Sequence, residues 1–276
     1  MKYSLLLTLA VLPYLSFSQK FQASLFGGVA NYQGDLQGKR LSFKESHPAI
    51  GIGASYDLTS HFILRTGFTY GRVSGSDKNN SSAKGVEFRN LDFRSDIWEF
   101  HLGADYNIFD LSERSLSPYV FAGVGLYHFD PFTRDAAGSK VFLQRLGTEG
   151  QGLAGYPSKY KTTQFNIPFG VGLKFALTEN IQLGFEIGLR KLFTDQLDDV
   201  SGNYADSTLL ADGNGSLAAQ LAYRGDELTG SPGYPAAGTQ RGNAKYKDWY
   251  NFTGLKVSYR IGGRKSKDTG CPSAVY

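Results

Sequence analysis

Apolar and polar residues alternate along much of the chain, most clearly over residues 165–177 and 181–190. Odd-numbered positions there are apolar, whereas even-numbered positions carry glycine, alanine, proline or polar side chains, including Lys174, Glu186 and Arg190. Successive side chains of a β-strand point to opposite faces, so these charges share one face with the glycines. An apolar face opposite a small, polar face is typical of a membrane-spanning strand, whose outer side contacts lipid and whose inner side lines a barrel lumen.

The same alternation recurs and predicts eight strands. We place them near residues 20–30, 48–57, 61–73, 93–109, 118–129, 163–177, 181–194 and 248–261. In the first and fifth of these segments both faces contain glycine and apolar residues, so the alternation does not establish which face is inward.

The connections between these segments alternate between short and long. The short ones are "LTSH", "DLSERSLS" and "TEN", whereas the long ones cover residues 31–47, 74–92, 130–162 and 195–247. Bacterial outer-membrane barrels have short periplasmic turns and long external loops. The pattern therefore predicts an all-β fold: an eight-stranded antiparallel up-and-down transmembrane β-barrel with short periplasmic turns and long external loops. Eight strands close a small barrel without a free edge.

Large aromatic residues fall near both ends of the predicted strands, where the two membrane interfaces are expected. Those near the external ends are Trp98, Trp249 and Tyr70, and those near the periplasmic ends are Tyr106, Phe109 and Tyr259. This distribution fits the two aromatic girdles of a membrane barrel.

The inward faces carry a set of ionisable side chains. The predicted lumen charge network comprises Arg65, Glu99, His101, Asp105, Lys174, Glu186, Arg190, Lys256 and Arg260. Charges of both signs that are removed from water must pair, so we favour a salt-bridged plug that replaces a hydrophobic core over a conduit. Glu99, His101 and Asp105 alternate on one face and would permit a catalytic site, but the same pattern arises in any polar lumen. We expect no enzyme activity and no catalytic residues.

The first residues have the pattern of a secretory signal peptide. Lys2 precedes an apolar run that extends to Leu15, and "SFS" at 16–18 is a small-x-small cleavage site. The run is shorter than the ~20 residues that a membrane-spanning helix requires. We therefore expect a cleaved signal peptide at 1–18, a barrel at 19–261 and a periplasmic C-terminal tail at 262–276, with the mature protein in the outer membrane of a Gram-negative cell.

Composition adds few candidate sites. The chain has 276 residues and a formal net charge of +4, without a basic block interleaved with aromatics, so nucleic acid is not an expected partner. The single cysteine, Cys271, cannot form an internal disulfide and is either a free thiol or an intermolecular partner.

A group of carboxylates follows the seventh predicted strand, at Asp195, Asp198 and Asp199. It would bind a divalent cation or, as we favour, solvate the base of a loop. We expect no cofactor and no metal.

Five strings in the long connections identify a resemblance. They are "ANYQGDLQG", "RNLDFRSDIWEF", "LQRLGTEGQG", "RKLFTDQLDDVSGNY" and "GTQRGNAKYKDWYNF". In this order they resemble the PorG family of outer-membrane proteins, which is associated with type IX secretion and gliding machinery, over about residues 21–261. The resemblance implies a non-enzymatic barrel that associates with the periplasmic ring formed by PorK and PorN, and it transfers no catalytic residues.

Two other functions remain open. The chain would alternatively be a stand-alone small barrel that binds lipid, a ligand or a surface target through its loops. An outer-membrane enzyme that modifies lipid is the least favoured alternative, because no nucleophile with a positioned base is visible. Outer-membrane lipids are expected partners in all three cases.

Overall fold

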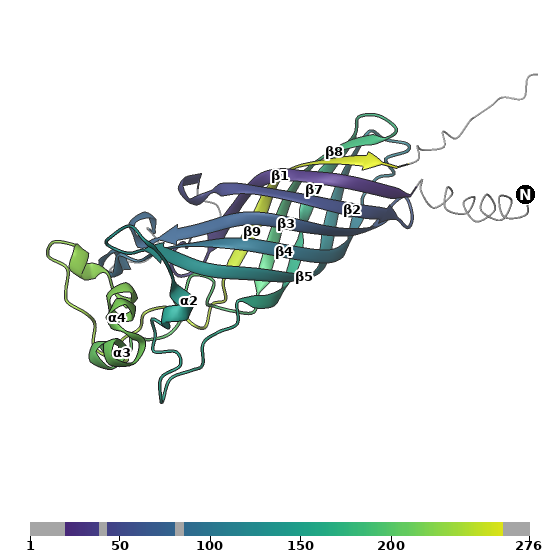
Figure 1. Cartoon of the computed structure of the whole chain (residues 1–276). Coiled ribbons are helices and arrows are strands. Elements are labelled where there is room, and N and C mark those ends of the chain that lie inside the picture. The colour runs from purple at the N-terminus through teal and green to yellow at the C-terminus, as the bar shows by residue number, and fades with distance from the viewer. Residues whose placement is uncertain (1–19, 39–42, 81–85, 262–276) are drawn as a thin grey trace, which may run out of the picture.

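Eight long strands close into an antiparallel barrel in a computed structural model that describes residues 20–38, 43–80 and 86–261 (Figure 1). Each strand pairs with its neighbours in chain order, and the last pairs with the first. The strands are β1 (Phe21–Gln33), β2 (His47–Asp57), β3 (Phe62–Ser76), β4 (Asp92–Asn107), β5 (Leu116–Arg134), β7 (Thr163–Ala176), β8 (Ile181–Leu192) and β9 (Trp249–Arg260). The predicted fold class is confirmed, whereas the predicted signal peptide, the tail and Cys271 lie outside the described residues.

Short and long connections leave the barrel at opposite ends. Residues 58–61, 108–115 and 177–180 form the short turns, and β1 begins and β9 ends at the same rim, where Gln22 is paired with Arg260. We call this rim the short-turn end and the opposite rim the long-loop end. The short turns match the predicted ones, because turn residues interrupt the alternation at these positions.

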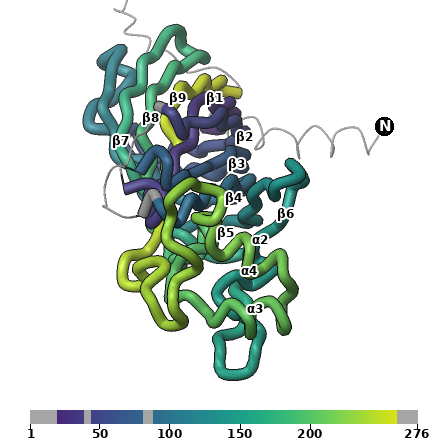
Figure 2. Tube along the Cα trace, turned by 90° about the vertical axis from the view of Figure 1, so that its left-hand side faces the viewer, coloured from purple at the N-terminus to yellow at the C-terminus, as the bar shows by residue number. Residues whose placement is uncertain are grey.

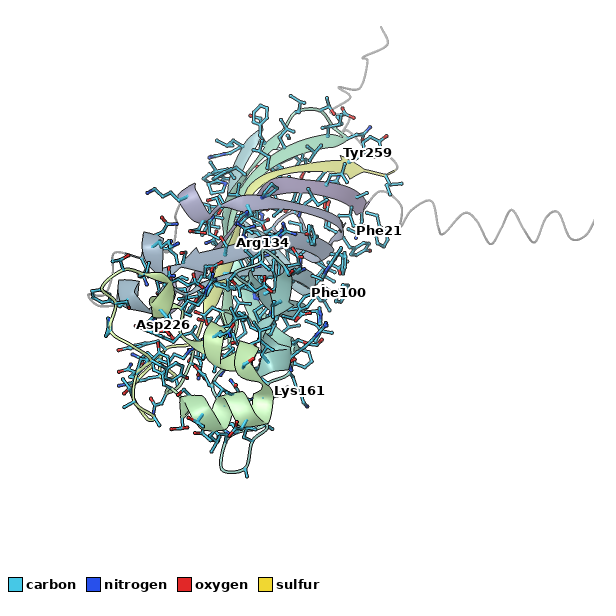
Figure 3. The ribbon with its side chains drawn as sticks, turned by 60° about the vertical axis from the view of Figure 1, so that its left-hand side comes forward. Phe21, Phe100, Arg134, Lys161, Asp226 and Tyr259 are labelled. Carbon is cyan, nitrogen blue, oxygen red and sulfur yellow. The ribbon has the colours of Figure 1, made fainter. Side chains whose placement is uncertain are left out.

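Side-chain burial alternates along the strands as a lipid-facing wall requires. Apolar side chains such as Ile52 and Leu255 are each 64% exposed, whereas the intervening polar side chains face inward and are buried. Phe21, Phe100 and Tyr259 are among the side chains that project from the wall (Figure 3). No helix within the described ranges is long and apolar enough to cross a membrane.

The two strands of uncertain phase are resolved in the structure. In β1 the inward positions are the even-numbered ones, and in β5 they are the odd-numbered ones, which include Tyr119, Phe121, Tyr127 and Phe129. Inward glycines on neighbouring strands make room for these rings. A Cβ atom on Gly172 would lie only 2.5 Å from Cε1 of Tyr119.

The long-loop end carries folded structure, where the sequence had indicated only long connections. Among the residues that the structure describes, the short strand β6 (Lys140–Phe142) lies here, paired with β5, together with the helices α2 (Leu143–Leu146), α3 (Ser207–Asn214) and α4 (Ser216–Ala222). Single 3-10 turns accompany them: η1 (Phe43–Glu45), η2 (Asp77–Asn79), η3 (Val86–Arg89) and η4 (Gly225–Glu227). We call residues 130–162 and 195–248 the cap. Figure 2 shows these helices and β6 gathered at one end of the barrel.

Candidate functional site: a sealed lumen beneath a folded cap

Glu99 and Arg190 form one centre of polar contacts in the lumen. The Arg190 guanidinium donates to both carboxylate oxygens of Glu99, with Nη2 3.0 Å from Oε1 and Nε 3.1 Å from Oε2. Oε2 also accepts hydrogen bonds from Tyr250 Oη at 2.6 Å and Asn166 Nδ2 at 2.9 Å. Glu99 is completely buried. Every polar contact of this carboxylate is therefore supplied by the protein.

A second centre lies nearer the short-turn end. Arg65 donates to both oxygens of Glu186, at 2.9 and 3.1 Å, and to Asp105 at 3.2 Å. Lys174 Nζ lies 2.7 Å from the other oxygen of Asp105, and Tyr119 donates to Glu186 at 2.7 Å. Asp105 is thus shared between two cations from different strands, whereas Glu186 pairs with Arg65.

The structure brings the remaining members of the predicted set to the same lumen. His101 Nδ1 lies 3.5 Å from Glu99 Oε1. Arg260 forms an ion pair of 2.5 Å with Asp57, a residue that is not in the set predicted from the sequence. Lys256 lies in the lumen beside Asp105 and Glu186 but forms no ion pair with any described residue.

Two small cavities lie around these charges. One of about 40 Å³ lies at the short-turn end near Asp105 and Lys256, and one of about 30 Å³ lies beside Arg65 and His101. Each has room for a few water molecules. Glu99 and Asp105 are each engaged by a cation, so this arrangement favours a plug over a conduit.

The outer half of the lumen is apolar, which corrects one expectation from the sequence. A salt-bridged plug was expected to replace a hydrophobic core, but such a core fills the barrel toward the long-loop end. Its largest buried members are Tyr32, Phe93, Ile97, Tyr127, Phe129, Leu192, Leu197, Tyr250 and Phe252. The charged layer and this apolar layer together seal the barrel.

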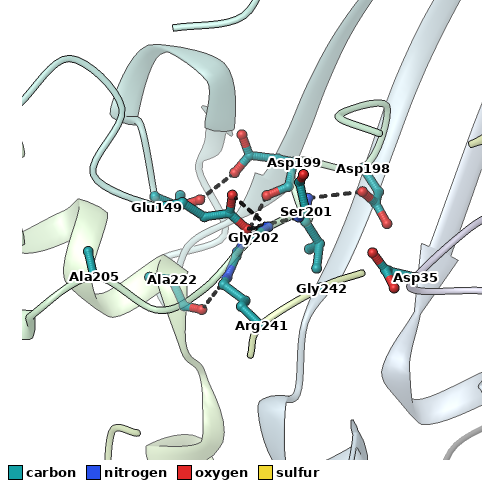
Figure 4. A network of polar contacts seen from close by, with 12 residues as sticks. Asp35, Glu149, Asp198, Asp199, Ser201, Gly202, Ala205, Ala222, Arg241 and Gly242 are labelled. Carbon is teal, nitrogen blue, oxygen red and sulfur yellow. Dashed lines mark hydrogen bonds and ion pairs between the residues drawn. The ribbon is translucent and has the colours of Figure 1, made fainter. Parts of the chain in front are cut away.

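Above the apolar layer, Arg241 links three parts of the cap (Figure 4). Its Nη1 lies 2.9 Å from Glu149 Oε1 and 2.6 Å from the Asp199 carbonyl, and its Nε donates to the Ala222 carbonyl at 3.0 Å. Glu149 in turn accepts from the backbone N–H groups at 201 and 202. Arg241 is 3% exposed, so its counter-charge comes from Glu149 and not from solvent.

Arg89 fastens the cap to the rim of the barrel. Its guanidinium forms an ion pair of 2.6 Å with Asp77 and donates to the backbone carbonyls of Arg241 and Asp35. The Arg241 carbonyl is separated from Arg89 by 152 residues in sequence. Segments from three long connections are therefore held together at one point.

The carboxylates at 195, 198 and 199 are buried, which corrects the expectation that they solvate a loop base. Asp199 is 0% exposed and accepts hydrogen bonds from Thr148 at 2.6 Å and Tyr160 at 2.7 Å. Asp198 accepts a short hydrogen bond from Tyr32. No group of three metal-ligating side chains suited to a metal ion is found in the described part of the chain.

Burial perturbs the acidity of these cap carboxyls. It raises the pKa of Asp199 to about 6 and the pKa of Asp195 to about 7. Burial, followed by repulsion from neighbouring carboxylates, also raises the pKa of Asp198 and of Asp248 well above the usual range. The cap therefore binds protons more tightly when folded than when unfolded.

Helices α3 and α4 add a small apolar cluster of their own. Asp206 caps α3 by accepting hydrogen bonds from the N–H groups of Thr208 and Leu209. The buried members of the cluster are Ala205, Leu210, Ala218 and Ala222, with Leu146, Leu153, Tyr156, Ala219 and Tyr234 packed against them. The long connections thus form a folded body, which the sequence analysis did not anticipate because short helices over glycine-rich loops give no sustained periodicity.

Several known outer-membrane proteins are similar to this chain. Neisserial surface protein A has 12% identity, a TM-score of 0.42 and coverage of 87% of this chain and 97% of that chain. Ail of Yersinia pestis has 10% identity, a TM-score of 0.42 and coverage of 88% and 99%. Outer Membrane Protein W of E. coli has 14% identity, a TM-score of 0.36 and coverage of 88% and 98%. No curated protein matches the chain.

The family comparison covers most of the sequence. The family described as outer membrane protein beta-barrel domain matches residues 4–224. This range includes seven of the eight wall strands and much of the cap. The chain belongs to the outer membrane protein beta-barrel domain family.

Proposed function

We propose that this small outer-membrane barrel is a non-enzymatic component of the type IX secretion machinery that associates with the periplasmic PorK/PorN ring. Its role is that of an interaction subunit: the wall fixes it in the membrane, and its two ends contact other proteins. The long-loop end is extracellular and the short-turn end periplasmic, as in other bacterial barrels.

The observation that carries this proposal is where the five family-like strings meet in the fold. Each contributes to one continuous group of cap and rim contacts, through Asp35, Arg89, Glu149, Asp199 and Arg241. The strings that resemble the PorG family are therefore the ones that build and fasten the cap. A resemblance located in a shared structural unit supports a shared role better than scattered matches would.

The sealed lumen favours an interaction role over transport. A charged layer and an apolar layer fill the barrel in series, and the lumen cavities measure about 40 and 30 Å³. A secreted polypeptide cannot pass through such a barrel. In this proposal the barrel therefore supports a machine whose passage lies elsewhere.

Deletion of the gene tests the role in secretion directly. We expect secreted cargo to accumulate in the periplasm of the deletion strain, and the wild-type chain to restore its release. Normal release of cargo without this protein would refute the proposal.

A crosslinking experiment tests the proposed ring partner. The chain has a single cysteine, so Cys271→Ser provides a background for one new cysteine at the exposed turn position Glu179. We expect a photoactivatable label there to capture ring proteins, identified by mass spectrometry. The matched control is Asp226→Cys in the cap (Figure 3), which should capture none of them. Capture from both positions alike would indicate non-specific labelling and count against the periplasmic contact.

The alternative is a stand-alone barrel whose cap binds a surface target. Exposed apolar side chains on the cap favour it, among them Leu209, 43% exposed, and Tyr246, 69% exposed. The two functions are separated by the deletion strain: a stand-alone receptor leaves secretion intact, whereas a secretion component does not.

A further inference from the structure

Four cations lie on the outer side of the wall directly beyond the aromatic belt at the long-loop end. The belt consists here of Phe68, Tyr70 and Trp98. The centre of the Trp98 ring lies 4.5 Å from the centre of the Tyr70 ring and 5.7 Å from the centre of the Phe68 ring. The cations are Arg72 on β3, Arg94 on β4, Lys140 on β6 and Arg145 on α2, and we call them the basic patch.

Aromatic rings connect these cations into one surface. Arg94 is paired across the sheet with Phe132, and Lys140 Nζ lies 3.8 Å from the centre of the Phe132 ring. Lys140 also lies 4.5 Å, and Arg145 4.2 Å, from the centre of the Phe142 ring. The charged groups of Lys140 and Arg145 thus lie over the faces of these rings, which is a cation–π arrangement.

The strand register places the inner part of the patch at headgroup depth. Arg72 pairs with Asp96, two residues beyond Trp98, and Arg94 is four residues beyond Trp98. With a rise of ~3.3 Å per residue and a strand tilt of ~40°, these positions lie roughly 5 and 10 Å beyond the belt. The headgroup region on each side of a bilayer is about 5–8 Å thick, so Arg72 lies within it and Arg94 at its outer edge.

The patch carries positive charge that the protein does not neutralise. Asp96 pairs with Arg72 at 2.7 Å, and Asp130 lies 3.5 Å from the exposed Arg145. Against four cations these two carboxylates leave two positive charges. Arg94 and Lys140 form no ion pair with any residue of the described ranges.

We propose that the basic patch binds the phosphate groups of a phosphorylated saccharolipid in the outer leaflet. Arginine presents a planar fork that matches phosphate oxygens, and lysine adds a point charge. The belt fixes the depth at which these groups meet the membrane, so the anion that they meet there is a lipid phosphate. Each cation near an anionic lipid surface contributes about a fivefold gain in affinity.

A fluorescence titration tests the proposal. The chain has two tryptophans, and Trp249→Phe leaves Trp98, directly below Arg94, as the reporter. The full chain is reconstituted in zwitterionic nanodiscs and titrated with diphosphoryl lipid A while Trp98 emission is followed. We expect saturable binding, and we expect Arg94→Ala with Lys140→Ala to weaken it roughly 30-fold.

A matched pair of substitutions controls for the loss of surface charge. Lys20 and Arg114 also lie over aromatic rings, 5.8 Å from the centre of Tyr56 and 4.3 Å from the centre of Phe109, but at the short-turn end. Lys20→Ala with Arg114→Ala should bind as the parent does. Each variant is first shown to be folded by the heat-dependent shift of its band in a gel. The single substitution Arg94→Glu, which reverses the charge at this position, is a second patch variant and should also weaken binding.

Two further titrations distinguish a lipid phosphate from free inorganic phosphate. Dephosphorylated lipid A should not saturate the Trp98 signal, and inorganic phosphate at the same concentration should neither produce the signal nor displace the lipid. Equal binding of dephosphorylated lipid, displacement by inorganic phosphate, or unchanged binding to the folded patch variants would overturn the proposal.

Discussion

Replacing Glu99 by Gln tests whether the lumen is sealed by paired charges. The substitution keeps the shape of the side chain but leaves Arg190, 2% exposed, without its counter-ion. It also weakens the acceptor at Oε2 that Tyr250 and Asn166 share. Breaking a buried ion pair from one side costs about 3–5 kcal/mol, and we expect a loss of this size in the free energy of unfolding.

The double variant separates the charge from the packing. Glu99→Gln with Arg190→Met removes both charges and fills a similar volume, so it should recover most of the loss. Unfolding is followed in guanidinium chloride by tryptophan fluorescence of the detergent-solubilised protein. Glu179→Gln, on an exposed turn, is the matched control and should change stability by less than about 0.5 kcal/mol.

Two outcomes would contradict the role assigned to the Glu99–Arg190 pair. If Glu99→Gln destabilises the barrel by less than about 1 kcal/mol, Arg190 must reach water or another counter-ion in the folded barrel. If the double variant is as unstable as the single one, the loss comes from packing and not from an unpaired charge.

Three further predictions concern the wall and the cap. Gly172→Ala places a Cβ against the Tyr119 ring and should cost about 1–3 kcal/mol of unfolding free energy, whereas Gly27→Ala, whose Cβ meets nothing within 4 Å, should be close to neutral. Arg241→Ala leaves Glu149 without its cation, so limited proteolysis should cut within residues 195–247 while the heat-dependent band shift of the barrel persists. A variant as resistant to the protease as the parent protein would contradict this. Because the folded pKa of Asp199 is about 6, above its unfolded value, the folded cap is favoured at low pH and loses up to about 3 kcal/mol as pH rises from 4 through 6. Amide exchange of α3 and α4, corrected for intrinsic rates, should therefore be faster relative to the barrel at pH 8 than at pH 5, and the opposite order would refute it.

The wall could be predicted from the sequence because it obeys one local rule. Period-two alternation identified all eight strands, and interruptions such as "TEN" at 178–180 located the short turns. Lipid outside and a filled lumen inside impose this rule at every residue. It failed to give a phase only where both faces are apolar, as around Tyr127 and Phe129, whose rings belong to the hydrophobic layer.

The cap could not be predicted in the same way. Its contacts join residues far apart in sequence, such as Arg241 with Glu149, 92 residues away. Such pairs produce no periodicity in the sequence. A buried arginine in a loop therefore cannot be distinguished by its sequence context from a solvent-exposed one. The dense runs of Asp, Asn, Gln and Tyr in the long connections were the available signal, because polar residues that bury themselves need many specific partners.

The fold requires that the lipid side and the lumen side of the wall alternate residue by residue. A spin-label scan of β9 in the Cys271→Ser background measures this alternation, with the protein in bilayers and collision rates recorded for oxygen and for a water-soluble nickel reagent. We predict high oxygen accessibility at 255, 257 and 259, with the intervening positions 254, 256 and 258 low for oxygen. Equal oxygen accessibility at odd and even positions, or high oxygen accessibility at 256, would show that the two faces of β9 are not separated in this way.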